Sequence, residues 1–182
     1  MIPDLAGIFI AGDYEDPLLR AVLKKFKYNF IAALGLPLAR FLILFWSGII
    51  FGRPDLAPVT EPQPVKTTSP LLIPIPLSKK RLRWRGFNQS EILTREVSRH
   101  FSYPLNFQLE RRRQSKPQAS LLENERLKNL TDAFAWTGEN LDGRTVILID
   151  DVVTTGATLN EAARILKAAG AEKVYGLVLA KG

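Results

Sequence analysis

The 182-residue sequence contains no cysteine, a single histidine and a single methionine. Without cysteine neither a disulfide nor a thiolate metal site can form, so we expect no zinc. One histidine excludes a metal site built from several imidazoles, and we interpret His100, at the end of a predicted helix, as a cap or surface residue. Metal binding is therefore left to oxygen ligands.

We expect no targeting segment. The first residues, 1–4, carry no positive charge of the kind that begins a signal peptide, so we expect a cytoplasmic protein. The long apolar stretch 30–51 has Arg40 near its centre, where a charge costs ~2.5–3.5 kcal/mol on insertion. Pro37 interrupts it as well, and the 11 residues 41–51 are too few to cross a bilayer. We predict a buried helix and no membrane span.

Positive charge is concentrated in the middle of the chain. The net charge is +7, and residues 67–129 alone hold 13 basic and 5 acidic side chains. Residues 130–182 hold 5 basic and 7 acidic side chains, and residues 1–66 hold 7 and 6. A field of this kind attracts polyanions.

The segment 146–158 carries the strongest functional signal. Four aliphatic residues, 146–149, have the pattern of a strand buried on both faces, and two carboxylates, Asp150 and Asp151, follow directly. Next come two valines, a small hydroxyl-rich turn at 154–158 and a helical pattern. Ligands of open α/β sheets bind beyond the carboxyl ends of the strands, where this segment is expected. Adjacent carboxylates at that position are costly without a ligand or partner.

This turn suits a sugar phosphate. Backbone N–H groups of a glycine-containing turn and threonine hydroxyls bind phosphate, and the following helix adds the positive end of its dipole. Thr158 and Glu161 have the spacing of a capping box, which would start the helix at the phosphate. Asp150 and Asp151 can accept hydrogen bonds from vicinal ribose hydroxyls, with a metal ion offsetting their repulsion. No Walker-type motif is present, which excludes that class of NTP site.

The chain is predicted to have three parts. Residues 1–51 form a helical segment with an amphipathic helix at 13–28 and a second helix at about 33–47. Residues 52–70 form a proline-rich linker, and residues 71–182 form an α/β core. Within the core we predict a short strand from 71 to about 74 or 76, a loop at 77–87, a helix from 88 to about 101, a strand at 145–149, a helix at 158–169 and a strand at 173–180.

The predicted loop at 77–87 is strongly basic and contains aromatic residues. Its cations supply pyrophosphate donors, contact nucleic-acid phosphates while the aromatics stack on bases, or form a solvated surface; the sequence leaves all three open. The nucleic-acid interpretation uses Lys79, Arg81, Arg83, Trp84 and Arg85. Asn88 we interpret as a helix N-cap rather than a ligand contact. For Arg111–Arg113 a plain surface run is as good an interpretation as any.

The segment 146–158 resembles the motif with which type I phosphoribosyltransferases bind phosphoribosyl pyrophosphate (PRPP). Further segments narrow the resemblance to the ComF (competence protein F) family, amidophosphoribosyltransferase-like proteins linked to DNA uptake. These segments are Pro74–Leu77, Arg81-x-x-x-Arg85-Gly86-Phe87-Asn88-Gln89, Arg113–Gln118 with Leu121, Arg126-x-x-Asn129 and Ala133–Phe134. Many members begin with a cysteine zinc ribbon. We expect a member without that ribbon, or one whose start has been lost or misannotated.

The resemblance implies a type I phosphoribosyltransferase-like α/β fold, with a twisted, mainly parallel sheet flanked by helices and an N-terminal helical segment. It implies binding of PRPP with Mg²⁺ and transfer of the phosphoribosyl group to a nitrogen acceptor, with release of pyrophosphate. The alternative is a non-catalytic module of the DNA-uptake machinery that binds single-stranded DNA and competence proteins.

The resemblance also implies a role for each site residue. Asp150 and Asp151 are the implied catalytic residues, holding the ribose hydroxyls directly or through Mg²⁺. The implied 5′-phosphate residues are Thr154, Thr155, Gly156, Ala157 and Thr158. A pyrophosphate loop would contain Ser78, Lys79, Lys80 and Arg81. A lid spanning about 111–129 would contain Gln118 and Arg126.

Overall fold

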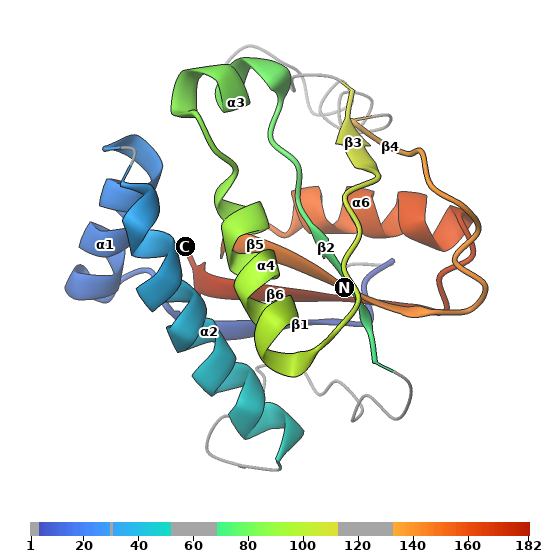
Figure 1. The fold of residues 1–182 in the computed structure, drawn as a ribbon, viewed down its shortest axis with the longest axis horizontal. Helices are drawn as coiled ribbons and strands as arrows, with labels where there is room; N and C mark the ends of the chain where they lie inside the picture. Colours follow the sequence, from blue (N-terminus) through green and yellow to red (C-terminus); the bar gives the residue numbers. More distant parts are fainter. Residues whose placement is uncertain (1–3, 30, 52–68, 113–132) are drawn as a thin grey trace.

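A computed structural model describes residues 4–29, 31–51, 69–112 and 133–182, and its centre is a four-stranded parallel sheet (Figure 1). The strand order is β1-β6-β5-β2, where the strands are β1 (Gly7–Asp13), β6 (Lys173–Lys181), β5 (Thr145–Val153) and β2 (Leu71–Pro74). The predicted α/β class with a mainly parallel sheet is confirmed.

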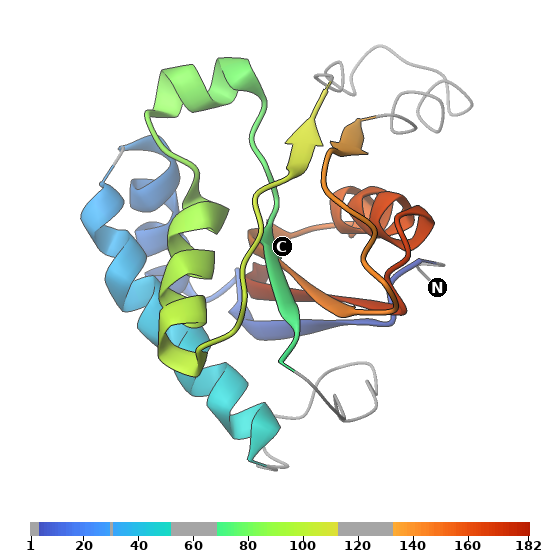
Figure 2. The same cartoon turned by 45° about the vertical axis from the view of Figure 1, so that its right-hand side comes forward.

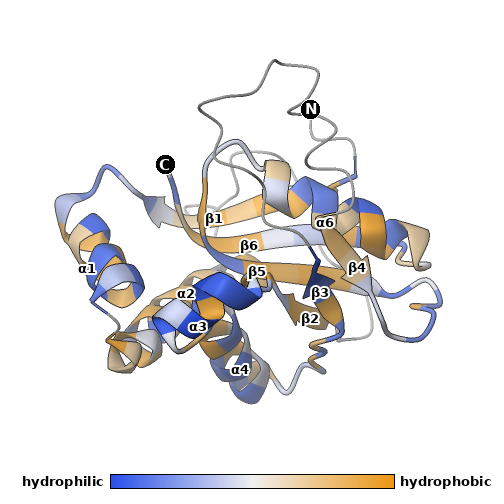
Figure 3. Ribbon diagram, turned by 90° about the horizontal axis from the view of Figure 1, so that it is seen from above, coloured by the Kyte–Doolittle hydropathy of each residue, from blue (hydrophilic) through white to orange (hydrophobic). Residues whose placement is uncertain are grey.

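Helices cover both faces of this sheet. On one face lie α1 (Pro17–Tyr28), α2 (Gly35–Ile50) and α4 (Gln89–Phe101), and on the other lies α6 (Ala157–Ala168) (Figures 1 and 3). Alternate residues of β5 serve the two faces: Ile147 packs in the cluster with α2 and α4, and Leu148 in the cluster with α6. The continuous aliphatic run of β5 is thus explained by burial on both sides.

The prediction that the N-terminal segment is helical was wrong in one respect. The segment begins with strand β1. β1 pairs in parallel with β6, and Phe9 lies opposite Leu177. Its short apolar run between glycines gave too weak a pattern to be recognised in the sequence. The division into three parts stays a prediction, but residues 7–13 lie in the same sheet as the core strands.

Helices α1 and α2 begin slightly later than predicted. α1 starts at Pro17. The side chain of Asp16 caps this start by accepting the N–H of Leu19 at 2.7 Å. A single 3₁₀ turn, Ala32–Leu34, precedes α2. α2 also continues to Ile50, beyond the predicted end at 47, and the two predicted helices are otherwise confirmed.

Helix α2 is buried along one face. By length and composition alone, Ala32–Ile50 is apolar enough to cross a membrane. In this fold Leu42 and Trp46 are fully buried, and the Trp46 ring meets Phe9 of β1 edge-on at 4.8 Å between centroids. Leu44, on the opposite face, is 71% exposed. The predicted buried helix is therefore half-buried.

The prediction of a loop over 77–87 was wrong, because Lys79–Arg85 form helix α3. The hydroxyl of Ser78 accepts the N–H of Arg81 at 3.3 Å and caps the start, and Gly86 ends the helix with a φ of 82°. Lysine, arginine and leucine between these caps favour a helix.

A second, antiparallel sheet joins β3 (Leu109–Arg111) to β4 (Phe134–Trp136). Figures 1 and 2 both place this pair and α3 at the upper end of the molecule. The linker prediction falls almost entirely on 52–68, and the lid residues Gln118 and Arg126 fall within 113–132. Both segments lie outside the described residues.

Candidate functional site

The acidic pair lies within β5 rather than after it. β5 continues to Val153, four residues beyond its predicted end, because Asp150 and Val152 still pair with Val178 and Ala180 of β6. Asp151 is buried, with 7% of its surface exposed. The two carboxylates are therefore fixed on a strand at the centre of the sheet.

Asp150 is oriented by two hydrogen bonds to the same oxygen. Its Oδ1 accepts the hydroxyl of Ser90 at 2.9 Å and the N–H of Asp151 at 2.9 Å. Two effects raise the pKa of Asp150 to about 7. The larger is burial away from water, and the smaller is the negative charge of the neighbouring Asp151. Asp150 can therefore exchange a proton near neutral pH.

Asn88 fixes the helix that carries Ser90. Its side-chain oxygen accepts the N–H of Ser90 at 3.1 Å, and its side-chain amide donates to the carbonyl of Ile75 at 3.1 Å. The N-cap interpretation is confirmed, and the same side chain ties the start of α4 to the chain that leaves β2. Ser90 is thereby held at a fixed position beside Asp150.

Asp151 has a partner that the sequence did not predict. The ammonium of Lys27, near the end of α1, lies 2.9 Å from Oδ1 of Asp151, and the two side chains are 17% and 10% exposed. Helical spacing was the signal that could have revealed it. Lys27 falls four residues after Leu23 and eight after Leu19, on the apolar stripe of α1.

A pocket opens between the end of β5 and the start of α6. It is lined by Asp150, Val152, Val153, Thr154, Thr155, Gly156, Ala157, Thr158 and Leu159. The structure thus gathers Asp150 and all five predicted phosphate residues in one pocket. Gly156 has a φ of 77°, a left-handed conformation that favours glycine.

The predicted capping box at the start of α6 was wrong. Gly156 is the N-cap residue and has no side chain to offer, and Glu161 instead pairs with Arg164 at 2.8 Å. The hydroxyl of Thr155 accepts the N–H of Ala157, but at a long 3.4 Å. The first turn of this 12-residue helix therefore offers N–H groups to an anion in the pocket.

Two arginines surround the acidic pair. Arg85 donates to Oε1 of Gln89 at 2.6 Å and lies over the ring of Tyr28, and Arg111 lies over the ring of Phe134. Burial lowers the pKa of both guanidinium groups. Nearby carboxylates act in the opposite direction. Asp151 and Asp150 raise the pKa of Arg85, and Asp150 raises the pKa of Arg111.

These arginines also have unused hydrogen-bonding capacity. The Nε atoms of Arg85 and Arg111, together with Nε2 of Gln89, are buried without a hydrogen-bond partner among the described residues. Arg81 acts electrostatically on both arginines and lowers the pKa of each. The three cations therefore belong to one positive region beside the carboxylates. The sequence predicted Arg85 on a nucleic-acid surface and Arg111 in a charged surface run.

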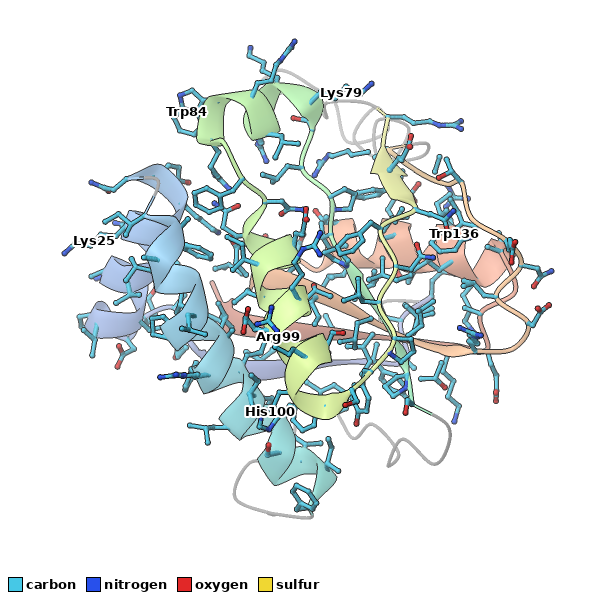
Figure 4. The ribbon with its side chains drawn as sticks, viewed as in Figure 1. Lys25, Lys79, Trp84, Arg99, His100 and Trp136 are labelled. Atoms are coloured by element: carbon cyan, nitrogen blue, oxygen red, sulfur yellow. The ribbon has the colours of Figure 1, made fainter. Side chains whose placement is uncertain are left out.

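None of the other predicted basic residues lines the pocket. Lys79, Lys80, Arg81, Leu82, Arg83 and Trp84 are all exposed on α3, which Figure 3 shows as a hydrophilic helix. Figure 4 shows Lys79 and Trp84 pointing outward from it. Ser78 is buried and serves as a helix cap. His100 is exposed near the end of α4, so its interpretation as a surface residue is confirmed.

The acidic pair has the oxygen chemistry that Mg²⁺ prefers. Both hydrogen bonds to the Asp150 carboxylate reach Oδ1, and no hydrogen bond to its Oδ2 is made within the described part of the chain. The same part contains no cluster of three or more His, Cys, Asp or Glu side chains. One or two carboxylates together with substrate phosphates and water suffice for Mg²⁺, so the pair fits an ion that arrives with a phosphorylated ligand.

The phosphoribosyl transferase domain family matches residues 88–182, which include α4, the acidic pair and the whole pocket. The chain belongs to this family. The match covers just over half of the chain and omits the two N-terminal helices. The phosphoribosyl transferase domain therefore contributes the acidic pair, and a segment outside the matched residues contributes Lys27.

Its relatives confirm the resemblance to the ComF family. Competence protein F of Haemophilus influenzae is 39% identical over 114 residues, which are 60% of this chain and 50% of that protein. The DNA utilization protein YhgH of Escherichia coli O157:H7 is 36% identical over 104 residues, 57% of this chain and 45% of that protein. The chain spans about half the length of the curated relatives it matches.

A solved structure of an asparagine mutant of an HPRT, made to analyse an invariant aspartic acid, is similar with a TM-score of 0.46. The two chains are 14% identical, and the similarity covers 81% of this chain and 67% of the other.

Proposed function

We propose that this domain binds PRPP at the end of β5 and transfers its phosphoribosyl group to a nitrogen acceptor, with release of pyrophosphate. The observation that carries the proposal is the pocket in which Asp150 meets the turn 154–158 and the start of α6. A ribose 5-phosphate needs acceptors for its hydroxyls and donors for its phosphate a few ångströms apart. Both are supplied by neighbouring residues of one chain segment.

The 5′-phosphate would bind in the turn. The left-handed Gly156 brings backbone N–H groups toward the pocket, and the threonines on either side add hydroxyl donors. The first turn of α6 contributes unpaired N–H groups and the positive end of the helix dipole. Such a site selects a dianion because it supplies many donors at close range.

The ribose would lie against the acidic pair. Asp150 and Asp151 accept hydrogen bonds from its vicinal hydroxyls, and Asp150 is already oriented by Ser90. Mg²⁺, when bound with PRPP at these carboxylates, supplies charge neutralisation for the pyrophosphate leaving group. Arg81, Arg85 and Arg111 add positive charge on the same side, with two buried N–H groups ready to donate.

The reaction is a displacement at C1 of the ribose. The lone pair of the acceptor nitrogen forms the N–C1 bond, and the bond from C1 to the pyrophosphate oxygen breaks with its electron pair. The carboxylates stabilise positive charge that develops on the ring. An acceptor nitrogen that carries a proton then releases it, and Asp150, with its pKa raised to about 7, is the candidate base.

Calorimetric titration of PRPP with Mg²⁺ tests this proposal. Wild type is compared with Asp150→Asn/Asp151→Asn and with a control, Glu15→Gln/Glu139→Gln, which removes the same charge from exposed positions. We expect binding to be lost in the first variant and kept in the control. Pyrophosphate release on addition of nitrogen acceptors then tests transfer. Folded wild type that does not bind PRPP would contradict the proposal.

A second candidate function is binding of single-stranded DNA in natural competence, in the cytoplasm. Six consecutive residues of α3, Lys79–Trp84, are exposed, and Trp84 is 59% exposed. Cations beside an exposed aromatic ring suit phosphates and stacked bases. Two relatives bear names that link them to competence and DNA utilization. In this function α3 would also be available to competence proteins.

Anisotropy of a labelled oligothymidine, measured across salt concentrations, tests the second function. The variant Lys79→Ala/Arg81→Ala/Arg83→Ala should bind more weakly, with a salt slope smaller by about 2, since each single-strand phosphate contact contributes ~0.7. Arg40→Ala/Arg144→Ala/Lys173→Ala removes the same charge from exposed positions elsewhere and serves as the control. If both variants lost the same affinity for the oligonucleotide, the binding would depend on net charge alone and not on α3.

A further inference from the structure

The pair between Lys27 and Asp151 joins two parts of the chain that the family match separates. Lys27 belongs to α1, outside residues 88–182, whereas Asp151 lies inside them. The ammonium lies 2.9 Å from the carboxylate, and both side chains are mostly buried. A cation of the chain itself thus already contacts the carboxylate of Asp151.

We propose that Lys27 is a positioning residue of the PRPP site, which acts as the resident counter-ion of Asp151 and competes with divalent metal for that carboxylate. The inference rests on the proposed function, because the site it adjusts is the proposed PRPP site. It concerns how strongly that site depends on Mg²⁺.

The acidic pair needs a counter-ion even without ligand. Asp150 and Asp151 are adjacent on β5, and Asp151 is 7% exposed, so their charges repel in a poorly solvated place. Lys27 lowers this repulsion when neither metal nor PRPP is bound. The contact with the ammonium thereby holds the carboxylate of Asp151 in one orientation.

Lys27 is held at this position by its own helix. Leu23 and Phe26 of α1 are fully buried, and the ring of Phe26 packs 5.6 Å from that of Phe87, between α3 and α4. Arg85 lies over the ring of Tyr28, the next residue after Lys27. The ammonium therefore reaches Asp151 from a backbone that is fixed on both sides.

Competition follows from the geometry. A divalent ion that binds Asp151 must displace the ammonium from Oδ1 or share the carboxylate with it. Without Lys27 the carboxylates gain affinity for a metal ion and lose a positive charge near PRPP. Removal of Lys27 should therefore tighten metal binding and weaken binding of PRPP in the absence of metal.

The same helix supplies a matched control. Lys24 and Lys25 are exposed and belong to the same lysine-rich end of α1, and Figure 4 shows Lys25 pointing away from the body of the protein. Lys25→Met makes the same replacement as Lys27→Met and removes the same charge, but at an exposed position. Lys27→Arg keeps a cation at the original position and should behave as wild type.

The first experiment follows Mn²⁺ binding through its electron paramagnetic resonance signal, with and without PRPP. We expect Lys27→Met to lower the Mn²⁺ concentration at half-saturation by about fivefold or more, since a pair this buried interacts more strongly than an exposed pair. Lys25→Met should leave it unchanged. The effect should vanish in an Asp151→Asn background, because no carboxylate is then left to compete for.

Calorimetry supplies a second readout, the ratio of the PRPP dissociation constants without and with saturating Mg²⁺. This ratio should rise in Lys27→Met and stay at the wild-type value in Lys27→Arg. Lys27→Gln replaces Lys27→Met if the latter fails to fold, as judged by circular dichroism. Equal Mn²⁺ half-saturation in wild type and the neutral variant would overturn the inference. Wild type that binds Mn²⁺ but not PRPP would contradict the proposed function instead.

Discussion

The hydroxyl of Ser90 donates a hydrogen bond to Oδ1 of Asp150 at 2.9 Å, although 60 residues separate them in the sequence. Ser90 lies in the first turn of α4, and Asn88 fixes that turn against the carbonyl of Ile75. The orientation of the carboxylate on β5 is therefore set by a different helix. Ser90 can be changed without removing any charge from the site.

Ser90→Ala should weaken PRPP binding by about ten- to a hundredfold, because a hydrogen bond to a charged group contributes roughly 1.5–3 kcal/mol. Asp150 would keep the N–H of Asp151 as a donor but lose the hydroxyl that orients it. Calorimetry with PRPP and Mg²⁺ measures the change. Ser98→Ala is the control, since its hydroxyl on the same helix bonds to the carbonyl of Tyr103. Wild-type affinity in Ser90→Ala would show that this orientation is unimportant.

Asp150→Asn should raise stability at alkaline pH. The pKa of Asp150 is raised in the folded protein to about 7, from 3.8, so the folded state holds the proton more tightly than the unfolded state. The unfolding free energy of wild type therefore decreases as pH rises from about 4 to about 7. Asparagine avoids that loss, and its oxygen can still accept both hydrogen bonds.

Urea unfolding at pH 5 and at pH 8 measures this effect. We expect the advantage of Asp150→Asn over wild type to be larger at pH 8. An advantage of equal size at the two pH values would contradict the raised pKa.

Gly156→Ala should lower both stability and affinity for ribose 5-phosphate. A side chain at a φ of 77° costs roughly 1–2 kcal/mol, and relief of that strain would move the N–H groups of the turn. Gly143→Ala is a matched control, because Gly143 has a φ of 75° and an added Cβ meets nothing within 4 Å. Both variants should melt at lower temperature, but binding should weaken in Gly156→Ala alone. Equal binding in the two would place the phosphate elsewhere.

Arg111→Met should separate stability from binding. Burial lowers the pKa of Arg111 and its Nε has no partner among the described residues, so its charge is costly to the fold. Methionine can keep packing against Phe134, and we expect the unfolding free energy to be unchanged or higher by up to ~1 kcal/mol.

Affinity for pyrophosphate should nevertheless fall in Arg111→Met, as isothermal titration with Mg²⁺ and pyrophosphate measures. The neighbouring exposed Arg112→Met provides the control and should change neither quantity. A large loss of stability in Arg111→Met would instead make Arg111 a structural residue.

The sequence predicted the parts of the site that lie together in the chain. The aliphatic run before Asp150, the turn around Gly156 and the helix after it form one continuous pattern, and all are present in β5 and α6. Asn88 was recognised because an N-cap has a local signature. The capping box of Thr158 and Glu161 did not form, because α6 begins at Ala157 with Gly156 as its N-cap, and Glu161 pairs with Arg164.

Contacts between distant segments were not predictable in the same way. Lys27 carries the helical spacing of a buried face, yet nothing local indicates that Asp151 is its partner. Arg111 was one of three consecutive arginines, and only the β3–β4 pairing places it over Phe134 and near Asp150. Strand β1 was missed because a short parallel edge strand depends on its neighbour β6 more than on its own pattern.

The position of β6 also bears on how the protein is made. β6 lies between β1 and β5, yet it is the last of these strands to leave the ribosome. Until it emerges, β1 has no neighbour in the sheet, and the apolar faces of α1 and α2 lack most of the surface they cover. The apolar faces of α1 and α2 therefore stay largely uncovered until β6 has been synthesised, a condition that favours chaperone binding and late, cooperative folding.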